Sequence, residues 1–279
     1  MRRNYLPWVV AVLVSVVAFD ANLRAQETAS APVKKDVPYV PTPQNVVDRM
    51  LEMAEVKKGD TVYDLGCGDG RIIVTAAKKH GANGIGVDID PQRIKESQEN
   101  AQAAGVSEQV KFEIKDLFTM EFKDADVLAM YLLPDVNMKL RPKILDGMKP
   151  GSRIVSHSFD MDDWKPDAED QVDDSTIYFW VVPAKVEGSW NATIKPANGG
   201  AGGAEQKATL ELKQKFQDVT GTAKVDGKDF ELKDAKLKGD ALTFTLTGEG
   251  GDAKYTAKVD GSKLTGQDDK KATLTAEKK

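Results

Sequence analysis

The sequence predicts an α/β unit, with a mostly parallel sheet covered by helices on both faces, followed by a small antiparallel β unit. Two observations lead to this prediction. From residue 42 to about residue 182, apolar strand-like segments alternate with helix-like segments, which is typical of a parallel sheet. From about residue 186 no helical pattern continues, and short alternating segments are separated by Asp-Gly and Gly-rich turns. A length of 279 residues suits two folded units.

The composition excludes several classes of protein. With 41% hydrophobic and 30% charged residues, the chain is neither disordered throughout nor a multi-span membrane protein. A formal net charge of −5, without a stripe of Lys and Arg, predicts that nucleic acid is not a partner. One cysteine, Cys67, excludes an intrachain disulfide, and with only two histidines the sequence predicts no metal site.

The N-terminus has the layout of a secretory signal. Two arginines precede an apolar run at residues 5–19, and a short polar stretch ends near residue 25. Because the run is shorter than the roughly 20 residues that span a bilayer, we expect a cleaved signal peptide at residues 1–25 and an exported protein, periplasmic or secreted. An uncleaved membrane anchor at residues 5–19 is the alternative. Residues 26–37 are expected to be a flexible linker.

The first unit is expected at residues 38–185. A helix begins at Thr42 and Pro43, since apolar residues then recur every three or four positions. Pro142 must lie near the start of the last helix or kink it. Strands are expected at residues 61–64, 84–88, 110–115, 126–131, 152–156 and 176–182, and helices at residues 71–80, 91–104 and about 136–148.

The second unit, at residues 186–279, is expected to be an antiparallel meander or a small barrel. The segment TAKVDG occurs at residues 222–227 and again at 256–261, which indicates a repeated hairpin. The Gly-rich residues 197–204 are expected to form a mobile loop. We expect a binding or stabilising role for this unit.

The chemistry of the chain is concentrated in residues 62–90, VYDLGCGDGRIIVTAAKKHGANGIGVDID. A strand ends at Asp64, glycines follow at 66, 68 and 70, and a second strand ends at Asp88. Glycines at the first strand-to-helix turn allow close approach of a ligand, and an acid that ends the next strand can bind both hydroxyls of a ribose. The sequence therefore predicts a nucleoside-containing ligand.

This stretch closely resembles the first motif of class I S-adenosylmethionine (SAM) methyltransferases, whose sheet is Rossmann-like. The resemblance covers roughly residues 38–183 and implies that SAM is the cofactor. It implies that the glycine loop faces the methionine moiety and that Asp64 supports its amino end. It also assigns Asp88 to the ribose and Asp116, after the third strand, to the adenine amine.

A narrower resemblance concerns the residues around this motif. The run PYVPTPQNVVDRML at 38–51, the run DLGCGDGRI, and a later Phe159 and Trp164 are similar to the family of the ATP-synthase c-subunit lysine methyltransferase and its prokaryotic relatives. The chain departs from that family where Asp88 replaces a glutamate and Cys67 a serine. Together the two resemblances assign to SAM binding the residues Tyr39, Thr42, Asp64, Gly66, Cys67, Gly68, Gly70, Asp88, Ile89, Asp116 and Leu117.

The lysine methyltransferase resemblance implies transfer of a methyl group to an acceptor nucleophile, a protein lysine amine. Methyl transfer from SAM needs chiefly orientation of the acceptor and exclusion of water. Tyr131 ends a strand on the predicted acceptor side, and His157 lies past a strand end on the same rim. Both are our candidate catalytic residues; Tyr131 could instead be a packing residue, and His157 a rim histidine with an ordinary hydrogen bond. Trp164 is either an aromatic wall for the acceptor or an anchor of its loop.

Two other functions remain open from the sequence. The acceptor could be a small or lipid-like molecule, or the chain could be an exported SAM-binding protein without catalysis. In each case no nucleic acid is expected as a partner, and membrane contact is expected only through an uncleaved N-terminal segment.

Overall fold

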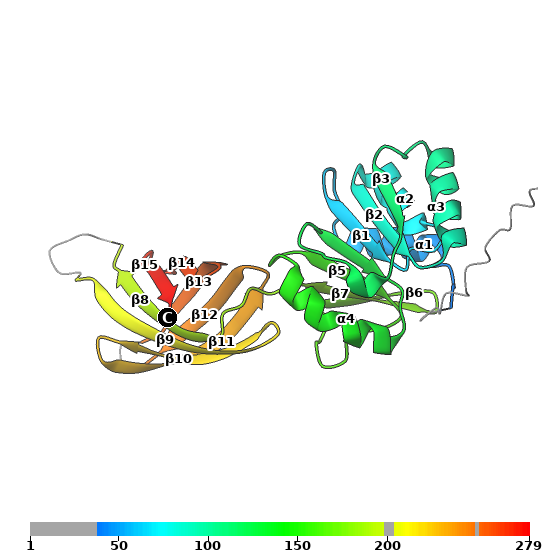
Figure 1. The fold of residues 1–279 in the computed structure, drawn as a ribbon. Helices are drawn as coiled ribbons and strands as arrows, with labels where there is room; N and C mark the ends of the chain where they lie inside the picture. The colour runs from blue at the N-terminus through cyan, green and yellow to red at the C-terminus, as the bar shows by residue number, and fades with distance from the viewer. Residues whose placement is uncertain (1–37, 198–203, 249–250) are drawn as a thin grey trace, which may run out of the picture. The chain divides into compact units, whose positions relative to one another are not determined.

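The computed structural model describes residues 38–197, 204–248 and 251–279, and these residues form a helix-covered sheet and a closed barrel (Figure 1). The predicted fold class, a Rossmann-like α/β sheet followed by an antiparallel β domain, is confirmed. The predicted signal peptide at 1–25 and linker at 26–37 lie outside the described residues, as does most of the predicted loop at 197–204. The predicted limit between residues 185 and 186 falls between the last strand of the sheet and the first strand of the barrel.

The sheet has seven strands in the order β3-β2-β1-β4-β5-β7-β6. The five strands β1 to β5 are parallel, whereas β7 is antiparallel to β5 and β6 is antiparallel to β7. The order in which strands are added to the sheet reverses between β1 and β4, so the carboxyl ends of β1, β2 and β4 border one crevice, where α/β proteins bind ligands. The strands are β1 (Thr61–Leu65), β2 (Asn83–Asp88), β3 (Val110–Ile114), β4 (Val127–Met130), β5 (Arg153–His157), β6 (Ala168–Val172) and β7 (Ser175–Val181).

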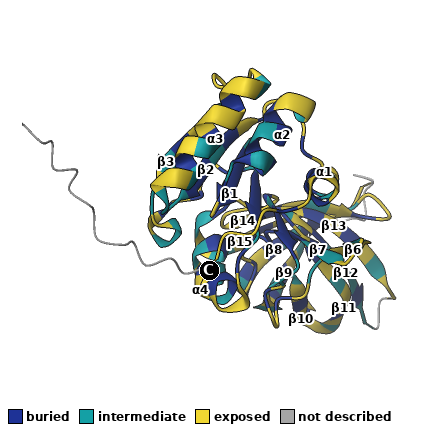
Figure 2. Ribbon diagram, turned by 90° about the vertical axis from the view of Figure 1, so that its right-hand side faces the viewer, coloured by how far each residue is buried: buried dark blue, intermediate teal, exposed yellow. Residues whose placement is uncertain are grey.

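Alternate strand residues pack into two apolar layers, one on each face of the sheet. On one face the layer holds α1 (Gln44–Met53), α2 (Arg71–His80) and α3 (Pro91–Ala104). On the other it holds α4 (Pro134–Gly147) and the short 3-10 helix η1 (Leu117–Thr119). Figure 2 shows the buried strands in dark blue beneath the exposed, largely yellow outer surface of α3, whereas most of α2 is buried or half-buried.

Helix limits follow local chemistry. The side chain of Asp90 caps α3 by accepting a hydrogen bond from the Gln92 N–H at 3.0 Å, and Pro91 takes the first helical position. Gly81 and Gly105 end α2 and α3 in left-handed conformations. These residues explain why the sequence predicted both helices to the residue.

Two features of the sheet unit differ from expectation. Strand β6, with the sequence AEDQV, was not predicted, because it is an edge strand with little apolar patterning. Helix α4 begins at Pro134 rather than near residue 136, and Pro142 lies inside it. Helix α4 thus continues through a proline that removes one backbone hydrogen bond.

The second domain is a closed antiparallel barrel whose strands run in the order β10-β11-β12-β13-β14-β15-β8-β9. Buried and exposed residues alternate along its strands, and the buried set forms a single apolar cluster that includes Trp190, Phe244 and Tyr255. The strands are β8 (Gly188–Lys195), β9 (Gln206–Lys215), β10 (Asp218–Val225), β11 (Lys228–Lys238), β12 (Ala241–Thr247), β13 (Ala253–Asp260), β14 (Lys263–Asp268) and β15 (Thr273–Lys278).

The repeated TAKVDG segment has the same place in two hairpins of the barrel. Each copy forms the end of a strand, β10 or β13, and continues into the turn that follows, at residues 226–227 in the first hairpin and 261–262 in the second. The interpretation as a repeated hairpin is consistent with this placement. Among the residues described, none of the helices has the length and apolar character needed to cross a membrane.

Candidate functional site

Three glycines shape the loop between β1 and α2. Gly66, Gly68 and Gly70 have φ values of 75°, 55° and 76°. Residues with a side chain rarely adopt such positive φ values. The N–H groups of Gly66 and Cys67 donate hydrogen bonds to the carbonyl of Val87 on β2, at 2.8 and 2.9 Å. The loop therefore turns sharply at the carboxyl edge of the sheet and is fixed to the neighbouring strand.

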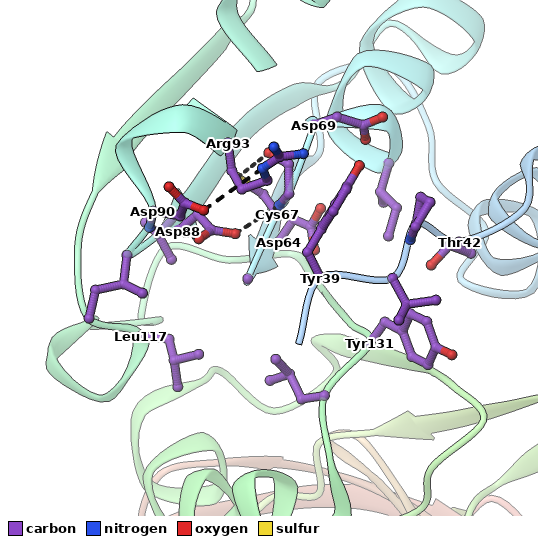
Figure 3. Close-up of a pocket in the computed structure, with 18 of the residues that line it drawn as sticks. Tyr39, Thr42, Asp64, Cys67, Asp69, Asp88, Asp90, Arg93, Leu117 and Tyr131 are labelled. Atoms are coloured by element: carbon purple, nitrogen blue, oxygen red, sulfur yellow. Dashed lines mark hydrogen bonds and ion pairs between the residues drawn. The ribbon is translucent and has the colours of Figure 1, made fainter. Parts of the chain in front are cut away.

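The ring of Tyr39 lies against Gly68. A Cβ atom at position 68 would lie 2.4 Å from Tyr39 Cε2, so the ring as well as the backbone requires glycine here. The Arg93 guanidinium lies 4.4 Å from the centroid of the same ring, a cation–π contact. Tyr39 is thus held between α3 and the glycine loop at the entrance of the site (Figure 3).

Gly70 serves packing instead of the cavity. It is the N-cap residue of α2, and a Cβ atom there would lie 2.7 Å from both Phe112 Cε1 and Ser97 Cβ. Phe112 belongs to β3 and Ser97 to α3. Gly70 does not line the cavity. The close packing of its backbone against β3 and α3 explains why this residue is a glycine.

Asp64 is a buried carboxylate at the carboxyl end of β1. Its exposed fraction is 2%, and among the described residues no hydrogen bond reaches its carboxylate. Burial, together with the charges of Asp88 and Asp69, raises the pKa of Asp64 to about 8. A cation beside the Asp64 carboxyl group would stabilise its ionised form and lower its pKa.

Asp88 and Asp116 are fixed by backbone donors. The carboxylate of Asp88 accepts hydrogen bonds from the N–H of Gly68 at 3.0 Å and from the N–H of Asp90 at 2.9 Å. Asp116 accepts from the N–H of Phe118 at 2.8 Å and so caps η1. Both carboxylates are held in place at the edge of the cavity, as a hydrogen-bonding site for a polar ligand requires.

Residues 38–42, which we call the strap, close one side of the cavity. The Arg71 guanidinium donates a hydrogen bond to the carbonyl of Thr42 at 2.9 Å and pairs with Asp69 at 2.6 Å. The Thr42 hydroxyl is hydrogen-bonded to Nδ1 of His157 at 3.2 Å. The end of the strap is thus tied both to the glycine loop and to β5.

Together these elements enclose a cavity of about 920 Å³, part of which is open to solvent (Figure 3). Most of the residues that the sequence assigned to the cofactor line this one cavity. They are Tyr39, Thr42, Asp64, Gly66, Cys67, Gly68, Asp88, Ile89, Asp116 and Leu117.

The charges of the cavity fit SAM, which carries a positive sulfonium and a positive ammonium beside one carboxylate. Five acidic residues line the cavity against three basic ones, and Asp64 has no cationic partner among the described residues. The ammonium group would lower the pKa of this carboxyl and supply the missing charge. Asp88 and Asp116 would hold the ribose and adenine, and the glycine loop leaves room for the methionine moiety.

The two candidate catalytic residues are adjacent, but only one reaches the cavity. Tyr131, directly after β4, lines it. His157 is 2% exposed and lies outside the lining, with its ring centroid 3.9 Å from that of Tyr131. His157 is the last residue of β5, and its imidazole is hydrogen-bonded between Thr42 and Ser175 instead of facing the cavity.

Burial lowers the pKa of His157 to about 4, so its imidazole is neutral at physiological pH. Its Nε2 is 2.9 Å from the Ser175 hydroxyl. A neutral ring with both nitrogens engaged supports Tyr131 and the strap, and we describe it as a positioning residue instead of a catalytic one.

Sequence reasoning missed several residues of the site. Asp69, Arg71, Asp90, Arg93 and Lys115 line the cavity. Asp69 and Arg71 flank the last glycine, and this position could have indicated that they belong to the site. The hydrogen bond from Arg71 to Thr42 joins residues 29 positions apart, so it leaves no local pattern in the sequence.

Cys67 is buried, and burial raises the pKa of its thiol above the usual range, so it is not a reactive thiolate. Its Sγ would lie 2.9 Å from a Cβ at Gly86, so it fills space under the loop. Within the described part of the chain no cluster of His, Cys, Asp and Glu suits a metal ion.

The Rossmann-like sheet, the glycine loop and the acidic cavity define a class I SAM-dependent methyltransferase. A family model described as the ANTKMT methyltransferase domain matches residues 64–168. A protein-lysine N-methyltransferase of Saccharolobus islandicus (strain REY15A) is 44% identical over 151 residues, 52% of this chain and 94% of the relative. The chain belongs to this methyltransferase family, and SAM is its cofactor.

Other similar proteins are also methyltransferases. The ATP-synthase c-subunit lysine N-methyltransferase of Homo sapiens is 29% identical over 131 residues, 47% of this chain and 55% of the relative. This chain therefore spans about half the length of the human protein. A structure from Salinibacter ruber, described as an RNA methyltransferase in complex with S-adenosyl-L-homocysteine, is 48% identical with a TM-score of 0.52; the match covers 53% of this chain and 96% of that one.

Proposed function

We propose that this SAM-dependent methyltransferase acts on lysine side chains of proteins. The observation that carries the proposal is the 44% identity to a protein-lysine N-methyltransferase over 94% of that relative. The balance of charge supports it, because acids outnumber bases around the cavity and the whole chain has a net charge of −5. A cationic lysine is attracted to such a surface.

Bound SAM supplies an activated methyl group, which passes to the acceptor nitrogen while the electron pair of the broken C–S bond returns to sulfur. The lysine ammonium, with a pKa of about 10.4, must first release a proton to solvent. The chain contributes mainly orientation. In this proposal Asp64, Asp88 and Asp116 hold the cofactor, the strap excludes water, and Tyr131 faces the acceptor.

An RNA acceptor is the second candidate, because the 48% identical structure from Salinibacter ruber is described as an RNA methyltransferase. The charge distribution of this chain opposes that choice. Phosphate backbones are bound by clusters of Lys and Arg, whereas the loop at residues 157–164, next to Tyr131, contains three aspartates and no Lys or Arg. We therefore favour the lysine acceptor.

One experiment distinguishes a protein lysine acceptor from an RNA acceptor. The purified protein is incubated with SAM labelled in its methyl group and a cell lysate, and the lysate is divided for treatment with ribonuclease or protease. We expect the label to survive ribonuclease, and mass spectrometry to find it on lysine. Label that disappears with RNA, or that is found only on small molecules, would overturn the proposal.

A matched pair of variants links the label to the cavity. Asp88→Asn removes a charge that lines the cavity and is expected to reduce labelling at least tenfold. Asp124→Asn changes an exposed aspartate in the loop before β4, at the opposite edge of the sheet, and should leave labelling unchanged. Equal loss in both variants would indicate a general folding defect.

Export of the chain is a separate proposal. It is supported by the secretory layout of residues 1–25, which lie outside the described structure. Expression of the full chain in a bacterial host, followed by fractionation and intact mass measurement, is expected to give a periplasmic or secreted protein that begins near Gln26. A full-mass protein in the membrane fraction would instead support the anchor at residues 5–19, and a full-mass cytoplasmic protein would contradict both.

A further inference from the structure

A second aromatic ring extends the wall of the cavity beyond Tyr131. The rings of Tyr131 and Phe159 are nearly parallel, with an interplanar angle of 20° and centroids 6.2 Å apart. Tyr131 lines the cofactor cavity, and Phe159 lies next to it without lining the cavity. Both side chains are partly exposed, and their surface is therefore accessible to an acceptor.

The backbone around Phe159 is strained, and hydrogen bonds from buried side chains hold it in place. Ser158 has a φ of 64°, a conformation that disfavours a side chain. The carbonyl of Phe159 accepts hydrogen bonds from Ser156 Oγ at 2.7 Å and from Asn137 Nδ2 at 3.3 Å. Asn137 is fully buried and also donates to the carbonyl of Asp160 at 3.1 Å. These hydrogen bonds fix the backbone that carries the Phe159 ring.

Trp164, the other aromatic residue of this loop, has a structural role. Its exposed fraction is 0%, and its carbonyl accepts a hydrogen bond from Trp180 Nε1 at 2.8 Å. Of the two roles left open by the sequence, the structure supports the anchor. This leaves Phe159 as the aromatic side chain that the loop presents near the cavity.

The charges around the two rings favour a cation. Asp160, next to Phe159, is exposed, and so is Asp135 on the first turn of α4. His157, packed against Tyr131, contributes no positive charge at neutral pH. An ammonium near an aromatic face gains a cation–π interaction, and the methylene stem of lysine packs well on apolar rings.

We infer that Phe159 and Tyr131 together form the acceptor-binding wall of the enzyme. The stem of the acceptor lysine packs along Phe159, its nitrogen enters the cavity at Tyr131, and Asp160 selects against anionic acceptors. This inference rests on the proposed lysine methyltransferase function and adds to it the residues that choose the acceptor.

The test uses the full chain and a synthetic peptide that contains a lysine labelled in the lysate experiment. For Phe159→Ala we expect the KM for the peptide to rise about tenfold, while the Kd for SAM measured by titration changes less than twofold. Phe159→Tyr keeps the ring and should restore the KM. Phe230→Ala, which removes a partly buried ring of the barrel, is the matched control and should leave both constants unchanged.

Two outcomes would overturn the inference. The first is an unchanged KM in Phe159→Ala, and the second is a parallel loss of SAM affinity, which would mean general damage to the site. If Phe159→Ala does not fold, Phe159→Leu keeps apolar volume without a ring and is expected to raise the KM by a smaller factor. Because the peptide exists only if lysine is labelled, a failure of the proposed function appears earlier and separately.

Charge reversal gives an independent readout. Asp160→Lys should lower kcat/KM for the lysine peptide about tenfold at low salt, with a smaller loss at high salt because exposed charges are screened. Asp229→Lys, on the exposed surface of the barrel, is the control for the added charge and should have no effect. An equal loss in both variants, or none in Asp160→Lys, would contradict a role of Asp160 in acceptor choice.

Discussion

The two domains of this chain differ in how they bury polar groups. In the sheet domain, Asp64, His157 and Asn137 are buried beside the cavity, and Asp64 finds no hydrogen-bond donor among the described residues. In the described part of the barrel, Asp268 alone is buried and polar, and it accepts hydrogen bonds from the N–H groups of Lys270 and Ala272 at 2.9 and 2.7 Å. The buried carboxylate of the barrel shapes a turn, whereas the sheet domain leaves a buried carboxyl group without a hydrogen-bond donor at the cavity, where a ligand can pair with it.

Glycines show the same contrast. Gly68 and Gly261 have nearly equal φ values, 55° and 57°. A Cβ at Gly68 would collide with Tyr39, whereas a Cβ at Gly261 would meet nothing within 4 Å. One backbone conformation thus serves a turn in the barrel and both a turn and a close approach in the cavity. Changes in the barrel should therefore affect stability, and changes in the cavity should affect binding.

The largest expected effect is on the barrel. Phe244 is 1% exposed and its ring is stacked on Tyr255 with centroids 5.2 Å apart. Phe244→Ala leaves a cavity and should lower the free energy of unfolding by about 3–5 kcal/mol. Denaturant unfolding followed by Trp fluorescence measures this loss, and titration should give an unchanged Kd for SAM. A weaker Kd would mean that the barrel takes part in cofactor binding.

Gly68→Ala should reduce SAM affinity, which Phe244→Ala leaves unchanged. The added methyl group displaces Tyr39 and strains the loop, so SAM affinity should fall about 100-fold, roughly 3 kcal/mol. Gly261→Ala imposes the same backbone strain without a collision and should cost only about 1 kcal/mol of stability with SAM affinity intact. Titration and thermal unfolding of both variants measure the difference. Equal SAM affinities would show that the close contact of Tyr39 with Gly68 does not matter for binding.

The sequence predicted the parts of this contrast that depend on local pattern. Apolar strands, helical spacing and the alternating glycines were sufficient to predict the succession of helices and strands in the sheet domain apart from β6, because each acts within a few residues. Strand β6 was missed because an edge strand of mostly polar residues has no core-facing pattern. Closure of the barrel depends on the pairing of β8 with β15, which is set by distant residues.

For the site, the sequence predicted which residues gather but not what they contact. Nearly all the residues assigned to SAM line one cavity, because the carboxyl ends of parallel strands share one edge. Gly70 and His157 do not line the cavity, because Gly70 packs against β3 and α3 and His157 is hydrogen-bonded between Thr42 and Ser175, and neither contact leaves a local pattern in the sequence. The strain at Ser158 that directs Phe159 toward Tyr131 also has no signature in the sequence.

The buried carboxyl group of Asp64 predicts that the affinity for SAM depends on pH. With a pKa of about 8, the carboxyl is mostly protonated at pH 6, and the ammonium of SAM favours its ionised form. SAM affinity should therefore rise as pH increases toward 8, by up to about tenfold per pH unit, and level off above it. Titration calorimetry in two buffers of different ionisation enthalpy should also detect release of about one proton at pH 6.5.

The variant Asp64→Asn tests the cause. It should bind SAM more weakly at pH 8 and lose most of the pH dependence and proton release. Because the folded-state pKa is raised, Asp64 makes the SAM-free protein less stable as pH rises from about 4 to about 8, and the variant should be more stable than the wild type at pH 8. A variant with unchanged pH dependence would assign the effect to another group.

The smallest expected effect concerns His157, which is buried like Asp64 but fully hydrogen-bonded. Its folded-state pKa is lowered to about 4, so its contribution to stability is present above its unfolded pKa of about 6.5 and is lost as pH falls toward 4. Between pH 7 and pH 5 the wild type should lose on the order of 1 kcal/mol more than His157→Phe, which keeps a ring against Tyr131 but does not titrate. Denaturant unfolding at both pH values measures this difference. Equal losses would show that His157 is protonated without cost in the folded protein.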